Sequence, residues 1–110
     1  MTTIQTFSNY RVLLALGAVD EYDNEVIEYL LWEVRVGRLL RLTAWGCHCC
    51  GNAHDVPLSE GTPCSLPTAA NQLWIFWDAT YIDDDAAESA KEIEQALAVA
   101  SDLLGAAPLA

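Results

Sequence analysis

The segment 47–71 constrains the fold of this chain more than any other stretch. It holds all four cysteines, both histidines and three of the four prolines, Pro57, Pro63 and Pro67. Proline removes a backbone donor and clashes with helix, so this segment is predicted to be neither helix nor regular strand. Unstructured loops of this length are uncommon in compact domains, so the connection needs an internal organiser.

The motif at residues 47–51, Cys-His-Cys-Cys-Gly, offers such an organiser. Cys47 and Cys50 form a Cys-x-x-Cys pair whose thiolates can face one ion, and the glycine that follows permits the tight turn of a zinc knuckle. A structural zinc needs two more ligands, and His54 and Cys64 of the same segment are the natural candidates. The predicted site is one structural zinc held by Cys47, Cys50, His54 and Cys64.

Two other interpretations of the cysteines stay open. They can be reduced and partly buried, since free thiols pack as small apolar groups. They can also form a disulfide, in which case a bond from Cys49 or Cys50 to Cys64 is easier than one between adjacent cysteines. The second half of the zinc motif departs from finger and ribbon patterns, because its two ligands are not a close pair.

No motif typical of an enzyme accompanies the segment. The chain has no glycine-rich phosphate loop, no Gly-x-Ser-x-Gly and no His-Glu-x-x-His. No glutamate stands beside a candidate zinc ligand in the way a metal hydrolase needs. We therefore expect a non-enzymatic protein.

Two stretches outside the proline-rich connection are predicted to be strands. Residues 38–46, RLLRLTAWG, lack a helix cap and end in threonine, tryptophan and glycine. The aromatic and β-branched run at 73–78, LWIFWD, predicts a second strand over 72–82. The two are expected to pair as an antiparallel hairpin with 47–71 as the connection.

Two longer stretches are predicted to be helices. Residues 21–36 follow Asp20 as a cap, gather acids at the N-terminal end and stop before Gly37. Residues 84–104 begin in a run of aspartates and carry small and apolar residues at helical spacing. Residues 10–19, YRVLLALGAV, fit helix or strand, and their leucine and alanine content favours helix.

These elements predict a single α+β domain over residues 1–110. A small antiparallel sheet packs against two or three helices, and the long Cys/His-containing loop joins two strands. Hydrophobic residues make up 53% of the chain, which is enough for a core. The tail 106–110 is expected to fray.

The charge of the chain excludes some partners. Its net charge is −11, from sixteen acids against five bases. Such a chain repels phosphate backbones and anionic membranes, so direct binding of nucleic acid or membrane is disfavoured. The simplest interpretation of the acids is a soluble surface that resists self-association.

A more specific interpretation places the acids in rows on the two predicted helices. Acids three or four residues apart on a helix are about 5–6 Å apart, comparable with the ~7 Å between phosphates implied by the rise of a duplex. Exposed aromatic residues beside them would act as anchors for a partner. The predicted partner-binding residues are Glu21, Glu25, Glu28, Tyr29, Trp32, Asp85, Glu88 and Glu92.

The chain is similar, in charge and size alone, to phage inhibitors of restriction and CRISPR systems. The predicted function is a small acidic inhibitor, a nucleic-acid mimic of phage or mobile-element type, that binds a basic nucleic-acid-binding protein. The alternative is a zinc-stapled structural or regulatory interaction module, possible as a homodimer, whose acidity serves solubility. The N-terminus lacks the basic and apolar regions of a signal peptide, so a cytoplasmic location is expected.

Overall fold

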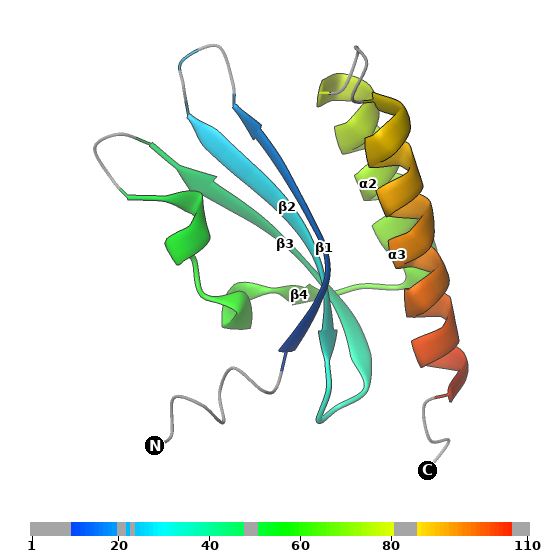
Figure 1. The fold of residues 1–110 in the computed structure, drawn as a ribbon. Coiled ribbons are helices and arrows are strands. Elements are labelled where there is room, and N and C mark those ends of the chain that lie inside the picture. The colour runs from blue at the N-terminus through cyan, green and yellow to red at the C-terminus, as the bar shows by residue number, and fades with distance from the viewer. Residues whose placement is uncertain (1–9, 20–21, 23, 48–50, 81–85, 107–110) are drawn as a thin grey trace.

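The fold is taken from a computed structural model, which describes residues 10–19, 22, 24–47, 51–80 and 86–106. Three long strands come first, then a connection with two short 3-10 helices and a two-residue strand, then two helices (Figure 1). The element bounds are β1 Tyr10–Val19, β2 Glu25–Glu33, β3 Arg38–Gly46, η1 Ala53–Asp55, η2 Leu58–Glu60, β4 Thr62–Pro63, α2 Leu66–Thr80 and α3 Ala86–Ala106.

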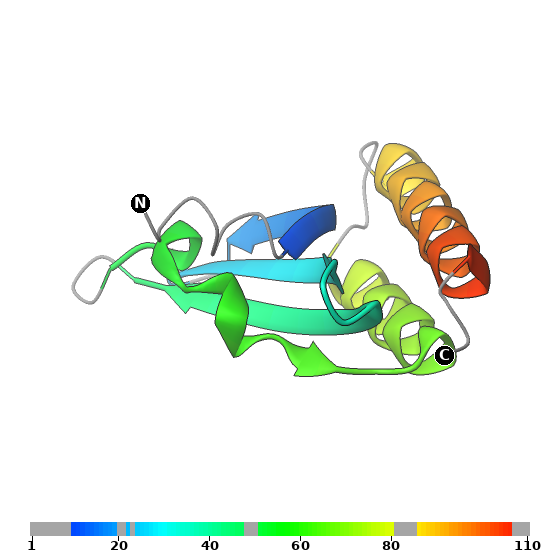
Figure 2. The same cartoon turned by 90° about the horizontal axis from the view of Figure 1, so that it is seen from below.

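The four strands form one antiparallel sheet in the order β1-β2-β3-β4. Helices α2 and α3 lie on one face of this sheet, and the connection that carries η1 and η2 lies on the other (Figures 1 and 2). We call these the helix face and the outer face. The predicted α+β class, with a small antiparallel sheet against helices, is confirmed.

The prediction of a helix over 21–36 is wrong, because residues 25–33 form strand β2. The strand pairs with β1 on one side and β3 on the other. Both of its faces are covered, so its side chains are apolar without the alternation that usually marks a strand. The resulting continuous run, EVIEYLLWE, matched helical spacing by coincidence.

Gly37 ends β2 in a different way from the one predicted. It lies in the turn between β2 and β3 with φ 75°, a conformation that glycine adopts without strain. Its N–H donates to the carbonyl oxygen of Glu33 at 2.8 Å. The glycine therefore closes a hairpin and does not cap a helix.

Residues 10–19 form strand β1, so the favoured helix prediction was wrong and its alternative was right. The pairing register with β2 shifts between Val12 and Leu14. Side chains alternate between the faces of a strand, and one extra residue exchanges the two sets. Tyr10 consequently packs on the outer face, whereas Leu14 and Leu16 enter the core on the helix face.

Strand β3 confirms the prediction for residues 38–46. The strand predicted over 72–82 is wrong, because Leu66–Thr80 is helix α2. The side-chain oxygen of Ser65 accepts a hydrogen bond from the N–H of Thr68 at 3.2 Å, which caps the helix. Pro67 falls in the first turn, where a missing N–H costs nothing. The aromatic run is thus one stretch of a helix.

Helix α3 confirms the prediction of a helix over 84–104, with residues 81–85 and 107–110 outside the described part of the chain. Ile93 and Ala100 are fully buried, as the predicted apolar stripe requires. Ala96 joins them, while Leu104 is exposed, so the buried stripe is rotated from the predicted one. Trp77 of α2 donates from Nε1 to the carbonyl of Ala86 at 2.8 Å and ties the two helices together.

Two separate hydrophobic clusters form on the two faces of the sheet. The helix-face cluster comprises Leu14, Leu16, Leu30, Trp32, Leu39, Ala69, Leu73, Ile93, Ala96 and Ala100. The outer-face cluster comprises Ile27, Tyr29, Leu31, Leu40, Leu42, Ala44 and Ala53.

Candidate functional site

The residues predicted to bind a partner are divided between surface and core. Glu28, Tyr29 and Trp32 are all buried, with Tyr29 in the outer-face cluster and Trp32 in the helix-face cluster. Glu25 is partly exposed at the start of β2. Because the segment is a strand, these residues do not form one row, and Glu21 and Asp85 lie outside the described residues.

Glu28 has a structural environment inside the protein. It is 4% exposed and lies on the helix face of β2. Arg41 Nη2 donates to Glu28 Oε1 at 3.0 Å, and Thr43 Oγ1 donates to Glu28 Oε2 at 2.7 Å. Buried carboxylates need such partners, because desolvating an unpaired charge is costly.

The acidic row survives on helix α3. Glu88 and Glu92 are exposed and one helical turn apart, and Glu94 and Asp102 are exposed on the same helix, with Lys91 as the one base. The ion pairs formed among the described residues join Glu33 to Arg38 and Glu28 to Arg41. Among the described residues, the acids of α3 therefore form no ion pair.

Two of the four predicted zinc ligands, His54 and Cys64, lie on opposite faces of the sheet. His54 lies in η1 and borders a cavity on the outer face, whereas Cys64 packs against the helix-face cluster. Cys47 follows the last residue of β3 and forms an isolated bridge with Gly51, and Cys50 is outside the described residues. Within the described ranges, no group of three or more His, Cys, Asp or Glu side chains is placed to hold an ion.

The residues on either side of the predicted knuckle pair through their backbones. Cys47 N donates to Gly51 O at 3.0 Å and Gly51 N donates to Cys47 O at 3.4 Å. The two residues thus form an isolated antiparallel bridge. Gly51 has φ 127°, which supports the sequence argument that glycine is needed here.

Cys64 is a partly buried thiol rather than an activated one. Burial raises the pKa of the Cys64 thiol above its ordinary 9.0, and the charge of Arg41 partly offsets this. A thiol with a raised pKa is a poor nucleophile at neutral pH. Its backbone N–H donates to Leu39 O at 3.0 Å, which fixes the entry to α2.

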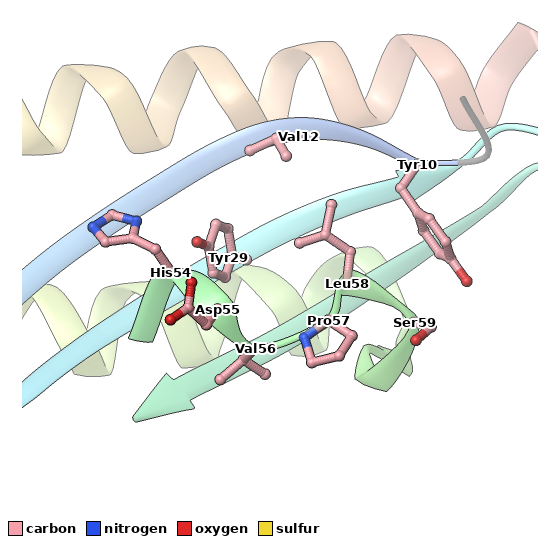
Figure 3. Close-up of a pocket in the computed structure, with 9 residues that line it drawn as sticks. All are labelled: Tyr10, Val12, Tyr29, His54, Asp55, Val56, Pro57, Leu58 and Ser59. Atoms are coloured by element: carbon pink, nitrogen blue, oxygen red, sulfur yellow. The ribbon is translucent and has the colours of Figure 1, made fainter. Parts of the chain in front are cut away.

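A cavity of about 550 Å³ lies on the outer face, between β1, β2 and the connection. Figure 3 shows Tyr10 and His54 at its two ends, with Val12, Tyr29 and Leu58 between them. The complete lining is Tyr10, Val12, Tyr29, His54, Asp55, Val56, Pro57, Leu58 and Ser59. Most of this wall is apolar, with a few polar groups.

The two ends of the cavity carry different polar groups. Figure 3 shows the hydroxyl of Tyr29 directed to the end where His54 and Asp55 lie. Tyr29 is 9% exposed. Its side chain lines the cavity. Ser59 and the hydroxyl of Tyr10 lie at the opposite end, so the cavity has an apolar middle, and its acid, Asp55, lies at one end (Figure 3).

A close backbone approach holds the connection against the sheet. A Cβ on Gly46 would collide with the backbone nitrogen of Ala53 and would lie 2.9 Å from backbone carbonyl atoms of Asn52 and Gly51. Only glycine allows this contact. Ala53 is fully buried beneath it, and this anchors η1 and its neighbours His54 and Asp55.

The sequence interpretation missed this cavity. Some of its lining residues belong to strand β1, whose pairing register shifts. Others belong to the connection, which the sequence analysis considered only for its cysteines and histidines. One usable signal was present: the apolar residues Val56, Pro57 and Leu58 beside His54 and Asp55 resemble the mixed lining of small-molecule sites.

Comparison of the chain with protein-family models, with curated proteins and with solved structures gave no match. Among the described helices, neither is long and apolar enough to cross a membrane.

Proposed function

We propose that this protein is a small acidic, non-enzymatic binding protein that docks on a basic, nucleic-acid-binding protein and inhibits it. The observation that supports this is the exposed acidic face of α3. Glu88, Glu92 and Asp102 are exposed there, and Glu94 is exposed on another side of the helix; none of them forms an ion pair with a described base.

The spacing on α3 suits the proposal. Glu88 and Glu92 are four residues apart, and side chains at this spacing are about 5–6 Å apart on a helix. A groove built for phosphates about 7 Å apart can accept such a row. The original prediction used rows on two helices. The present proposal uses one, because the segment around Glu28 is a buried strand.

The test compares two double variants that remove equal charge. Glu88→Gln with Glu92→Gln removes charge from the proposed face. Asp78→Asn with Glu60→Gln removes it from exposed positions on other elements. Each variant and the wild type are used to capture partners from cell extract, with mass spectrometry, and duplex DNA is then added.

We expect the wild type and the control to retain a basic nucleic-acid-binding protein that DNA or salt displaces, and the α3 variant to lose it. Because charge steering depends on ionic strength, the wild-type affinity should fall between low and physiological salt. Retention by the α3 variant at wild-type level would contradict the proposal.

The alternative proposal is a zinc-stapled interaction module that forms a homodimer. It is favoured by the backbone hydrogen bonds between Cys47 and Gly51, which flank the predicted knuckle in sequence. The outer edge of β1 adds to it, because Val12 and Val19 are exposed there and residues 10–19 include no acid. Among the described residues β1 is an end strand of the sheet, and an edge strand can act as a template for a second strand. Sedimentation of the wild type and of Val12→Lys separates a dimer from a monomer.

A further inference from the structure

We propose that the outer-face cavity binds a small organic cation with an apolar body, such as an arylalkyl ammonium ion. This site is independent of the acidic face of α3. It is a site for a small molecule rather than for a protein.

The size of the cavity fits a small ligand. Its volume of about 550 Å³ falls within the range of known small-molecule sites, which is roughly 300–1,000 Å³. Val12, Val56 and Leu58 supply aliphatic walls, and the ring of Tyr10 closes one end (Figure 3). Val12 is 46% exposed at the β1 edge, so the cavity is accessible from that side.

The hydroxyl of Tyr29 supplies the first polar contact. The residue is more than nine-tenths buried and its ring is held in the central strand β2. Its side chain lines the cavity, and its hydroxyl is not one of the buried polar atoms that lack a partner among the described residues. A ligand group that hydrogen-bonds to this hydroxyl replaces water there, and such an exchange favours binding by a modest amount.

The sign of the charge follows from the lining. Asp55 is an acid at the same end as the Tyr29 hydroxyl, and none of the nine described lining residues is a lysine or an arginine. Two tyrosine rings line the cavity, and aromatic faces attract cations. The net charge of −11 adds long-range attraction for a cation and repulsion of an anion.

The geometry assigns the parts of the ligand. Its ammonium group lies at the end formed by Asp55 and Tyr29, where it donates to the carboxylate and to the hydroxyl oxygen. Its apolar body extends past Val12 and Leu58 toward Tyr10. His54, at the same end as Asp55, limits the length of the head group (Figure 3).

The test uses three probes of nearly equal shape: phenethylammonium, 2-phenylethanol and 3-phenylpropanoate. Binding is followed by ¹H–¹⁵N chemical-shift titration of the whole chain. We expect phenethylammonium to bind with a Kd of about 1 mM or tighter, given its size. The alcohol should bind about tenfold more weakly, and the anion should not bind. The shifted amides should belong to β1, β2 and residues 54–59.

Four variants test the assignment of the contacts. Tyr29→Phe keeps the packed ring and should raise the Kd for phenethylammonium about fivefold. Asp55→Asn should raise this Kd about tenfold. Val12→Trp places a large ring at the accessible edge and should abolish binding. Asp78→Asn removes an acid on α2 and should leave the Kd unchanged.

Equal affinity for the three probes would overturn the proposal, as would an unchanged Kd in Val12→Trp. Unshifted amide spectra of Tyr29→Phe and Asp55→Asn away from the cavity establish that these variants are folded. If Asp55→Asn and Asp78→Asn raised the Kd for phenethylammonium equally, general charge attraction and not the contact with Asp55 would explain the binding. The proposal would then fail.

Discussion

Arg41 and Glu28 face each other across β2 and β3, with Arg41 Nη2 3.0 Å from Glu28 Oε1 and the side chains 30% and 5% exposed. Thr43 occupies the second carboxylate oxygen. The charge of Glu28 is thus held by two neighbours on β3 and hidden beneath the helices. Among the described residues, Arg41 Nε is a buried donor without a hydrogen-bond partner.

Removing the cation should destabilise the fold. Arg41→Ala leaves the carboxylate of Glu28 buried and uncompensated, so we expect the free energy of unfolding to fall by about 2–3 kcal/mol. Arg41→Lys keeps a charge and removes the unpartnered Nε, so it should lose less than about 1 kcal/mol. Urea denaturation measures both.

The exposed pair Arg38–Glu33 provides the control. The Arg38 side chain is 49% exposed, and surface pairs of this kind contribute about 0–1 kcal/mol. Arg38→Ala should therefore cost less than Arg41→Ala. Equal costs would contradict the structural role assigned to Glu28.

The close approach at Gly46 gives a second prediction. Gly46→Ala forces the backbone of Asn52 and Ala53 away from β3, so stability should fall by about 1–3 kcal/mol. A Cβ at Gly17 meets nothing within 4 Å, so Gly17→Ala should change stability by less than about 0.5 kcal/mol. Thermal and urea unfolding distinguish the two. A silent Gly46→Ala would mean that the connection is not held here.

The Cys64 thiol gives a prediction about reactivity. Burial raises its pKa, so iodoacetamide at pH 8 should modify Cys64 more slowly in the folded protein than in urea. Residue-resolved mass spectrometry separates it from the other cysteines. Alkylation at equal rates in both states would contradict the burial.

The same shift makes stability depend on pH. The raised pKa means that the unfolded chain loses this proton first, so the stability that Cys64 contributes is complete below about pH 9 and is lost as the pH rises through the higher folded value. The free energy of unfolding should fall above pH 9 more steeply in the wild type than in Cys64→Ala. Parallel curves would exclude this linkage.

The separation of His54 from Cys64 makes the zinc prediction specific. If the loop binds zinc, Cys47→Ser should lower the metal content measured by atomic absorption, and Cys64→Ser should leave it unchanged, because Cys64 packs on the opposite face from His54. Equal loss in both variants would support the four-ligand site predicted from sequence. A chain that purifies without zinc and resists chelator would contradict a zinc site of either composition.

The sequence predicted correctly those elements whose residue pattern fits only one type of secondary structure. Strand β3 and helix α3 follow their local propensity, and the α+β class follows from them. Strand β2 was predicted wrongly because other elements cover both of its faces. Most of its residues are therefore apolar, and the alternation that marks a strand is missing. Helix α2 was predicted wrongly because its aromatic residues have high β propensity. In addition, its N-terminal cap, Ser65, lies in the segment that was predicted to be a loop.

The candidate site was less predictable than the fold. The acidic face at Glu88 and Glu92 was predicted, because it needs only a helix and its exposed positions. The cavity brings Tyr10, Tyr29 and Asp55 together from three places in the sequence. That proximity depends on strand pairing and on the contact at Gly46, which periodicity does not encode.

The register shift at Val12 and Leu14 has a consequence for the length of β1. Positions before the shift supply the outer-face cavity, and positions after it supply the core beneath the helices. Deleting one residue there would move the side chains of Tyr10 and Val12 to the helix face of the sheet. The cavity would then lose these two residues from its lining. The number of residues in this strand, more than the identity of any one of them, therefore couples the binding cavity to the folded core.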